Sequence, residues 1–213
     1  MDEEERKRRL QAADYSLFHS GDARAAYALL KPLLAEKNPE AGFLYSMFSF
    51  GNEETEMEFE ARGLRLLKES ADAGYPPAIF ALSEWYVVDG EDRGLASTLL
   101  KKSVELAYPP AKLVYGLCLF HGEWPLQKDE YKGLNLIREA VAENAENAKE
   151  ALEEIEALFL ERGHGVEGKN DLRKGHDGGD ETTRPDDTVP KMRENPSWLL
   201  QWPSMDATTK IIF

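Results

Sequence analysis

Apolar residues recur through roughly the first 160 residues at the three- and four-residue spacing of amphipathic helices, and no stretch shows the alternation typical of a β-strand. The spacing predicts one helix over residues 6–20 and another over residues 23–36. Between them, Asp22 is placed to cap the second helix. Pro32 lies inside that second helix and is expected to kink it.

Prolines mark the starts of later predicted helices. A proline in the first helical turn loses no hydrogen bond that the helix would have made, and its φ already suits a helix. The helix-start prolines are Pro39, Pro76 and Pro109. A loop of acids over residues 53–58 is predicted to lead into a helix that Gly74 closes. A last helix is predicted over residues 147–162, with glutamates on its outer face.

Two sets of small residues recur along the chain with the same three steps of 37, 33 and 37 residues. The first set is Ala41, Ala78, Ala111 and Ala148, and the second is Ala26, Gly63, Ala96 and Gly133. A fixed period of this size indicates stacked supersecondary units, and small residues let helices approach closely where their axes cross. We therefore predict an all-α fold, an α-solenoid of stacked antiparallel helix hairpins over residues 1–162, with a right-handed superhelical twist and a concave face.

The composition changes after residue 162. Residues 163–213 are rich in Gly, Asp, Lys and Thr and have little apolar periodicity, so we predict a flexible, mostly irregular C-terminal tail. Near its end lies an apolar segment with Trp198 and Trp202. These tryptophans are contact candidates that dock either on the solenoid or on a partner.

The stretch over residues 108–148 resembles the Sel1-like repeat, a relative of the tetratricopeptide repeat. The positions that follow the family pattern in order are Ala111, Gly116, Gly122, Asp129, Gly133, Ala140, Asn144 and Ala148. Val141 stands where the family has a second paired alanine, and Asn144 where it has a glycine. The resemblance extends over about residues 39–160 and is absent from the tail. It implies an adaptor that binds other proteins without a catalytic centre, and some bacterial members are immunity proteins that neutralise a toxin.

The formal net charge of the chain is −14 at pH 7. Residues 163–213 hold nine acids and seven bases, so −12 of this charge belongs to the predicted solenoid. An acidic surface repels phosphate backbones, which argues against a nucleic-acid partner. The charge favours a basic protein partner, such as a toxin or an effector, or simply a well-solvated surface.

The beginning of the chain is acidic with no apolar run behind it, which predicts no secretory signal. No stretch is long and apolar enough for a membrane span. The single cysteine, Cys118, cannot form an intrachain disulfide and fits a reducing compartment. We therefore expect a soluble, cytoplasmic protein.

Candidate chemistry is sparse. None of the four histidines has metal-ligand spacing to another ligand, so no metal and no cofactor is expected; they are His19, His121, His164 and His176. Cys118 and His121 lie three residues apart on a predicted helix and could form a nucleophile pair, but no orienting group or oxyanion site is evident. Capping of the helix end is the favoured role of His121. An enzyme with a Cys118/His121 site is the least favoured alternative.

The remaining candidate site is the concave surface, which the first helix of each hairpin lines in such solenoids. Residues off the apolar pattern there are the protein-binding candidates Ser46, Phe50, Glu84, Val87, Lys112 and Phe120. Phe50 and Phe120 are possible anchors because aromatic side chains dominate binding energies, unless they only cover neighbouring turns. The main hypothesis is a module that engages one protein through this face, and its narrower form is a cytoplasmic immunity protein. The alternative is a scaffold that assembles through its tail.

Overall fold

The computed structural model describes residues 1–50, 54–89, 92–123 and 126–161. Within these ranges the chain forms nine α-helices and no strand, which confirms the predicted all-α fold. The helices are α1 (Glu3–Phe18), α2 (Ala23–Ala35), α3 (Pro39–Ser46), α4 (Glu56–Asp72), α5 (Pro76–Asp89), α6 (Arg93–Glu105), α7 (Pro109–His121), α8 (Glu130–Ala142) and α9 (Ala148–Glu161). The predicted tail, with Trp198 and Trp202, lies outside the described residues.

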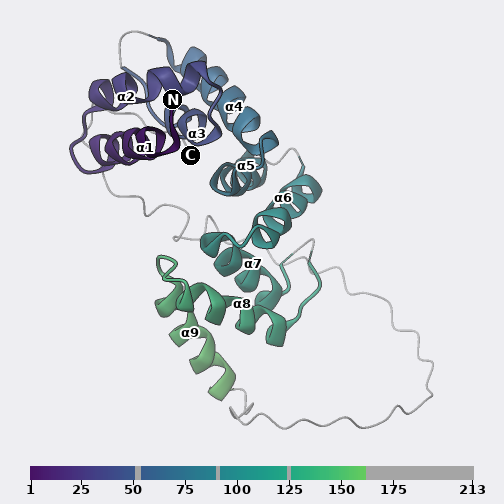
Figure 1. Cartoon of the computed structure of the whole chain (residues 1–213). Helices are drawn as coiled ribbons and strands as arrows, with labels where there is room; N and C mark the ends of the chain where they lie inside the picture. The colour runs from purple at the N-terminus through teal and green to yellow at the C-terminus, as the bar shows by residue number, and fades with distance from the viewer. Residues whose placement is uncertain (51–53, 90–91, 124–125, 162–213) are drawn as a thin grey trace.

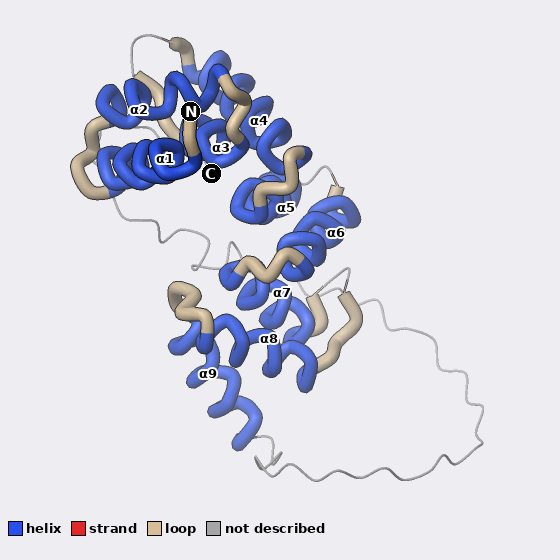
Figure 2. Tube along the Cα trace, in the orientation of Figure 1, coloured by secondary structure: helices blue, strands red, loops and turns tan. Residues whose placement is uncertain are grey.

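Consecutive helices pair as hairpins, and each hairpin packs on the next. Helix α1 packs on α2, α3 on α4, α5 on α6 and α7 on α8, while α2–α3, α4–α5, α6–α7 and α8–α9 contacts join neighbouring pairs. Figure 1 shows the pairs following one another along a curved path, and Figure 2 shows that short loops connect them. This arrangement is the α-solenoid that the two recurring sets of small residues, called ladders below, predict.

Three predicted helix starts are confirmed to the residue. Pro39, Pro76 and Pro109 are the first residues of α3, α5 and α7. The Asp22 carboxylate caps α2, accepting a hydrogen bond from the Ala25 amide at 2.9 Å. A first-turn proline and a capping carboxylate act within one turn of the chain, which is why sequence alone predicts them.

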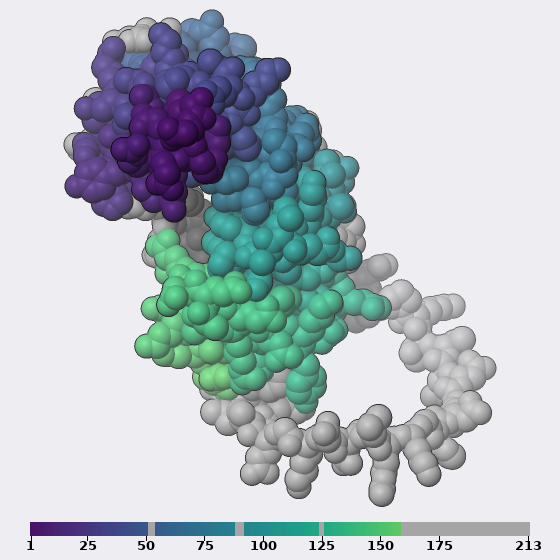
Figure 3. All heavy atoms as spheres, viewed as in Figure 1, coloured from purple at the N-terminus to yellow at the C-terminus, as the bar shows by residue number. Residues whose placement is uncertain are grey.

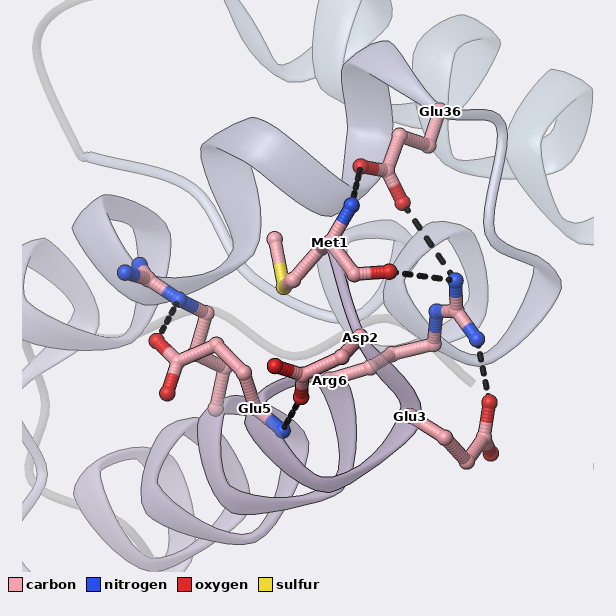
Figure 4. Close-up of polar contacts among 7 residues, drawn as sticks. Met1, Asp2, Glu3, Glu5, Arg6 and Glu36 are labelled. Carbon is pink, nitrogen blue, oxygen red and sulfur yellow. Dashed lines mark hydrogen bonds and ion pairs between the residues drawn. The ribbon is translucent and has the colours of Figure 1, made fainter.

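The first helix begins earlier than predicted, at Glu3 instead of residue 6. Asp2 caps it by accepting a hydrogen bond from the Glu5 amide at 2.8 Å. In Figure 4, Arg6 and the Met1 amino group both reach Glu36, which follows α2; the distances to its carboxylate oxygens are 3.7 and 3.4 Å. The acidic beginning of the chain is therefore a capped helical turn that is tied to the end of α2.

Helix α4 corrects the predicted acidic loop over residues 53–58, because the helix already begins at Glu56. Thr55 and Glu58 form a capping box: the Glu58 amide donates to Thr55 Oγ1 at 3.3 Å, and the Thr55 amide donates to Glu58 Oε2 at 2.8 Å. This reciprocal pair satisfies two amides that the helix leaves unbonded. The Thr-x-x-Glu spacing is a helix-start signal in the sequence, and the prediction of an acidic loop did not use it.

Each hairpin ends on one residue with a left-handed backbone, and these residues again recur at steps of 37, 33 and 37. They are Lys37 (φ 54°), Gly74 (φ 85°), Ala107 (φ 58°) and Asn144 (φ 58°). At the third of these turns the Ala107 amide donates to Val104 O at 2.9 Å and the Tyr108 amide to Ser103 O at 3.1 Å. This pattern terminates a helix and turns the chain toward the next one. Gly74 was predicted for this role, and it is the one glycine of the four.

Ala107→Gly is expected to stabilise the protein by about 0.5–1 kcal/mol, because an alanine in the left-handed region is strained and a glycine there is not. Ala107 is exposed, so the change removes no core packing. Urea unfolding monitored by circular dichroism measures the difference. Ala28→Gly, at an exposed position within α2, is the matched control and should lose a similar amount. A loss of stability in Ala107→Gly would contradict the strain argument.

The predicted alanine ladder lies where successive hairpins meet. Ala41, Ala78 and Ala111 are each the third residue of α3, α5 and α7, and Ala148 is the first residue of α9. All four are fully buried. The correspondence of these positions in successive hairpins confirms the register on which the fold prediction depends.

A third ladder completes the helix crossings and was missed in the sequence. Its members are Ser46, Ser83 and Gly116, at steps of 37 and 33 residues. A Cβ on Gly63 would lie 3.0 Å from Ser46 O, and a Cβ on Gly116 would lie 2.9 Å from Gly133 O. The closest crossing is between α7 and α8, where a Cβ on Gly133 would lie 2.5 Å from Gly116 O and 2.8 Å from the Phe120 amide nitrogen. The backbones of the last hairpin are thus in direct contact.

Candidate functional site

Acidic and phenolic side chains gather where α3, α5 and α7 begin. Tyr75 and Tyr108 each precede the first proline of a helix and hold the same place in their hairpins. Each ring packs edge-on against a phenylalanine of the preceding hairpin: Tyr75 on Phe43 at 5.6 Å, and Tyr108 on Phe80 at 5.5 Å between centroids. We call the set formed by these tyrosines and their acidic neighbours the acidic–tyrosine row; it consists of Asp14, Glu40, Tyr75, Glu84 and Tyr108.

The groups of the row are close enough to influence one another's ionisation. Burial raises the pKa of Glu40, and the nearby Asp14 raises it further. Burial also raises the pKa of Tyr75, and Glu40 is the next largest cause. For Tyr108, burial and then Glu84 raise the pKa, so the five groups form one connected series.

Glu84 is the most perturbed carboxyl of the row. Burial raises its pKa to about 7, and burial is the sole cause. In the described part of the chain, no lysine or arginine is among the causes of any shift in the row. No base therefore compensates the carboxyl groups of the row, and a cation would be stabilised beside those that are ionised.

Glu84 lies on α5, and Tyr75 and Tyr108 directly precede α5 and α7. Figure 1 shows α5 and α7 nearer the inside of the curve than α6, and Figure 3 shows the surface hollowed between the N-terminal and C-terminal hairpins. Of the predicted binding residues, Glu84 belongs to the row, and Val87 follows it on α5 with 51% of its surface exposed. Val87 thus offers exposed apolar surface for a contact, and Glu84 offers an acidic group.

Two of the predicted binding residues serve the fold at the end of α3. The Ser46 hydroxyl is half-buried and donates a hydrogen bond to Phe43 O at 2.6 Å. The Phe50 ring packs edge-on against Tyr27 at 5.1 Å, and the Arg24 guanidinium lies 5.6 Å from its centroid. Phe50 thus covers neighbouring turns, which is the alternative that the sequence left open.

The two predicted residues on α7 are turned inward. Phe120 is 1% exposed and lies in the core shared by α7, α8 and α9, so we remove it from the contact surface. Lys112 is 8% exposed, and its Nζ lies 2.7 Å from Glu143 Oε1 and 3.1 Å from Glu139 Oε2. The hydrogen bond to Glu143 raises the pKa of Lys112, which therefore stays charged and clamps α7 to α8.

Sequence reasoning missed Asp14, Glu40, Tyr75 and Tyr108. A signal for the tyrosines was available, because the string Tyr-Pro-Pro-Ala occurs at residues 75–78 and again at 108–111. The prolines and alanines were used to place helices, and the tyrosines before them were not considered. Asp14 and Glu40 have no such signal, since their proximity depends on how α1 packs on α3.

The geometry around Cys118 argues against the alternative catalytic pair. The thiol lies 3.6 Å from Glu123 Oε2, and burial followed by Glu123 raises the pKa of Cys118 to about 12. A thiol with so high a pKa is a poor nucleophile at neutral pH. The His121 ring packs edge-on against Phe120 at 5.2 Å, and α7 is closed by the Gly122 amide donating to Cys118 O at 2.9 Å. The helix end is thus closed by backbone, where an imidazole cap was predicted.

Among the described residues, no group of three or more His, Cys, Asp or Glu side chains is arranged to hold a metal ion. His164 and His176 lie outside them. In the same part of the chain, no helix has the length and apolar character needed to cross a membrane.

Comparison with known proteins finds matches among solved structures. No family model and no curated protein matches the chain. Among solved structures, the chain is similar to the crystal structure of a Sel1 repeat protein from Oxalobacter formigenes, with 21% sequence identity and a TM-score of 0.47, over 59% of this chain and 95% of that one.

Proposed function

We propose that this chain is a protein-interaction module, an adaptor or sequestering protein that engages one protein partner through the concave face of its solenoid. The observation that carries the proposal is the acidic–tyrosine row: Asp14 adds to the raised pKa of Glu40, Glu40 to that of Tyr75 and Glu84 to that of Tyr108, and no base is among the causes of these shifts. Val87 adds exposed apolar surface beside the row. In this proposal residues 1–162 are the binding unit and residues 163–213 are a tail that binding does not require.

The partner that fits this surface is a basic protein segment. A lysine or arginine side chain would supply the positive charge that the row lacks, and the long-range field of a chain with net charge −14 would speed its approach. Tyrosines are well suited to the contact, because they combine a large apolar ring with a hydrogen-bonding hydroxyl at low entropic cost. The half-buried Tyr75 and Tyr108 present such rings at equal places in successive hairpins.

A narrower form of the proposal is an immunity protein that neutralises a toxin. A sequestering module of this kind would cover the active site of a basic toxin, and the acidic character of the chain suits that task. The two forms differ in outcome: a sequestering protein abolishes an activity of the partner, whereas an adaptor leaves it intact.

Photo-crosslinking tests the proposed face. Benzoylphenylalanine replaces Tyr75 or Tyr108 in the proposed contact surface; in control chains it replaces Met57 on α4 or Tyr131 on α8, which are 77% and 71% exposed. We expect light-dependent adducts with one partner from the first two positions, and the cross-linked peptide identified by mass spectrometry should be rich in lysine and arginine. High salt during capture should weaken the signal.

Adducts confined to Met57 and Tyr131 would contradict the proposed face, and a cross-linked peptide of acidic character would contradict the proposed partner chemistry. The same cross-links made with a chain that ends at residue 162 distinguish the module from a scaffold that assembles through its tail. The module keeps its adducts in the shortened chain, and light scattering then finds its mass unchanged apart from the deletion.

A further inference from the structure

Glu84 occupies a position that is apolar in the neighbouring hairpins. The steps of 37 and 33 residues place it in register with Met47 and Leu117. Met47 is 4% exposed in the N-terminal core, and Leu117 packs against the core formed by α7, α8 and α9. Glu84, the middle residue of this series, is thus a carboxyl group at a place where the other two hairpins pack a methionine and a leucine.

Tyr108, at the start of the next hairpin, faces Glu84. Its ring packs on Phe80, one helical turn before Glu84 on α5, and the Glu84 carboxyl raises the pKa of its phenol. The equivalent pair in the last hairpins is Leu117 with Ala145, both in one apolar core. Glu84 therefore lies at the joint between the hairpin α5/α6 and the hairpin α7/α8.

Charged groups on the other elements that pack against α5 do not compensate Glu84. From α4, Lys68 Nζ lies over the rings of Trp85 and Tyr86, 5.5 and 5.9 Å from their centroids. From α6, the neutral Ser103 hydroxyl donates a hydrogen bond to Pro76 O of α5 at 3.1 Å. Within the described ranges, no ion pair joins a lysine or arginine to the Glu84 carboxyl.

We propose that the joint between the hairpins α5/α6 and α7/α8 is a pH-sensitive hinge, held closed by the protonated Glu84 side chain and loosened when that side chain ionises. The protonated Glu84 side chain can stay in this half-buried position, which is equivalent to the apolar positions of Met47 and Leu117. The ionised side chain is unstable there, because transfer of a charge out of water is unfavourable unless a partner compensates it. An opened joint returns the carboxylate to water.

The direction of the effect follows from proton linkage. The pKa of Glu84 is about 7 in the closed fold and 4.5 in the solvated group. Below pH 4.5 both forms hold the proton and Glu84 favours neither of them. As the pH rises from 4.5 to 7, the open form loses its proton first, so the closed joint becomes progressively less favourable. Above pH 7 both forms are ionised and the full effect persists.

Hydrogen exchange of α7 tests the hinge without any partner. The Lys112 amide donates to Tyr108 O at 3.2 Å in the first turn of α7, next to the joint. Its exchange is measured in the intact chain and in Glu84→Gln, which keeps the shape of the neutral acid but cannot ionise. The two proteins are compared at the same pH, so that the chemical exchange rates cancel. Glu40→Gln serves as the control for another half-buried acid of the row.

The hinge predicts nearly equal exchange of the two proteins at pH 4, where the open and closed forms both largely hold the proton, and an excess of about tenfold or more in the unmodified chain at pH 8.5. Glu40→Gln should exchange as the unmodified chain does. An excess that is the same at both pH values would overturn the proposal. If Glu84→Gln fails to fold, carbon-13 titration of the Glu84 carboxyl in the unmodified chain decides: a midpoint near pH 7 supports the hinge, and one below pH 5.5 overturns it. The result is independent of partner binding.

Discussion

Arg62→Met is expected to lower the free energy of unfolding by about 3–5 kcal/mol, which is the usual loss when one partner of a buried ion pair is removed. The Arg62 guanidinium on α4 is bound on every side. It donates to Tyr45 O at 2.7 Å and to Phe48 O at 2.9 Å, the carbonyls at the end of α3. It also makes two hydrogen bonds to the Glu54 carboxylate, at 2.7 and 3.0 Å.

Methionine fills a similar volume but leaves these groups without their donor. The Arg62 and Glu54 side chains are only 14% and 18% exposed, so the glutamate would stay charged in a place poor in water. The guanidinium also lies 4.1 Å from the centre of the Tyr45 ring, a contact that methionine replaces only in part. Since one side chain closes α3, holds the start of α4 and covers a ring, its loss should unfold this hairpin first.

Urea unfolding followed by circular dichroism measures the loss. Arg65→Met is the matched control, one turn away on the same helix; its ion pair with Glu69 is about 60% exposed on both sides, and the change should cost less than about 0.5 kcal/mol. Arg62→Lys should recover little of the stability, because an ammonium cannot form the bidentate contact and both carbonyl contacts together. Equal losses of stability in Arg62→Met and Arg65→Met would contradict the stabilising role of the Arg62 hydrogen bonds.

Gly133→Ala is expected to destabilise the protein by about 3 kcal/mol, at the upper end for an overpacked crossing. The new methyl group would lie 2.5 Å from Gly116 O and 2.8 Å from the Phe120 nitrogen. Both are backbone atoms of α7, so α7 and α8 must separate, and the buried Ile137 and Phe120 lose packing. The higher helix propensity of alanine recovers only about 1 kcal/mol.

Thermal unfolding compares this variant with Asn135→Ala, an exposed change to the same residue type on the same helix. Asn135→Ala should be neutral or slightly stabilising, since asparagine is a poor helix former. If Gly133→Ala matched that control, the close backbone contact between α7 and α8 would not exist in solution.

The helices and their order could be predicted because their signals are local. Pro39, Pro76 and Pro109 start helices through their own φ angle, and Asp22 caps α2 through an amide three residues away. The alanine ladder then extends a local signal to the stack, because a repeated crossing needs a small residue at each repeat. These features depend on sequence separation alone.

The contact surface could be predicted only in part, because it depends on how each helix is rotated about its axis. Phe120 was assigned to the surface from its place near a helix end, but the Gly116–Gly133 contact turns it under α8. Lys112 looked like an isolated charge on an apolar helix, and its partners Glu139 and Glu143 lie 27 and 31 residues later. Glu84 was predicted as a residue off the apolar pattern, whereas its relation to Tyr108 required the packed hairpins.

Spin-label distances along one ladder test the stacked register most directly. Lys31, Lys101 and Arg138 are exposed and equivalent in α2, α6 and α8. With neighbouring helices 8–10 Å apart, labels at Lys31 and Lys101, two hairpins apart, should lie about 20 Å from each other, and labels at Lys31 and Arg138 about 30 Å. A Lys31–Arg138 distance equal to or shorter than the Lys31–Lys101 distance would contradict the solenoid and, with it, the concave binding face.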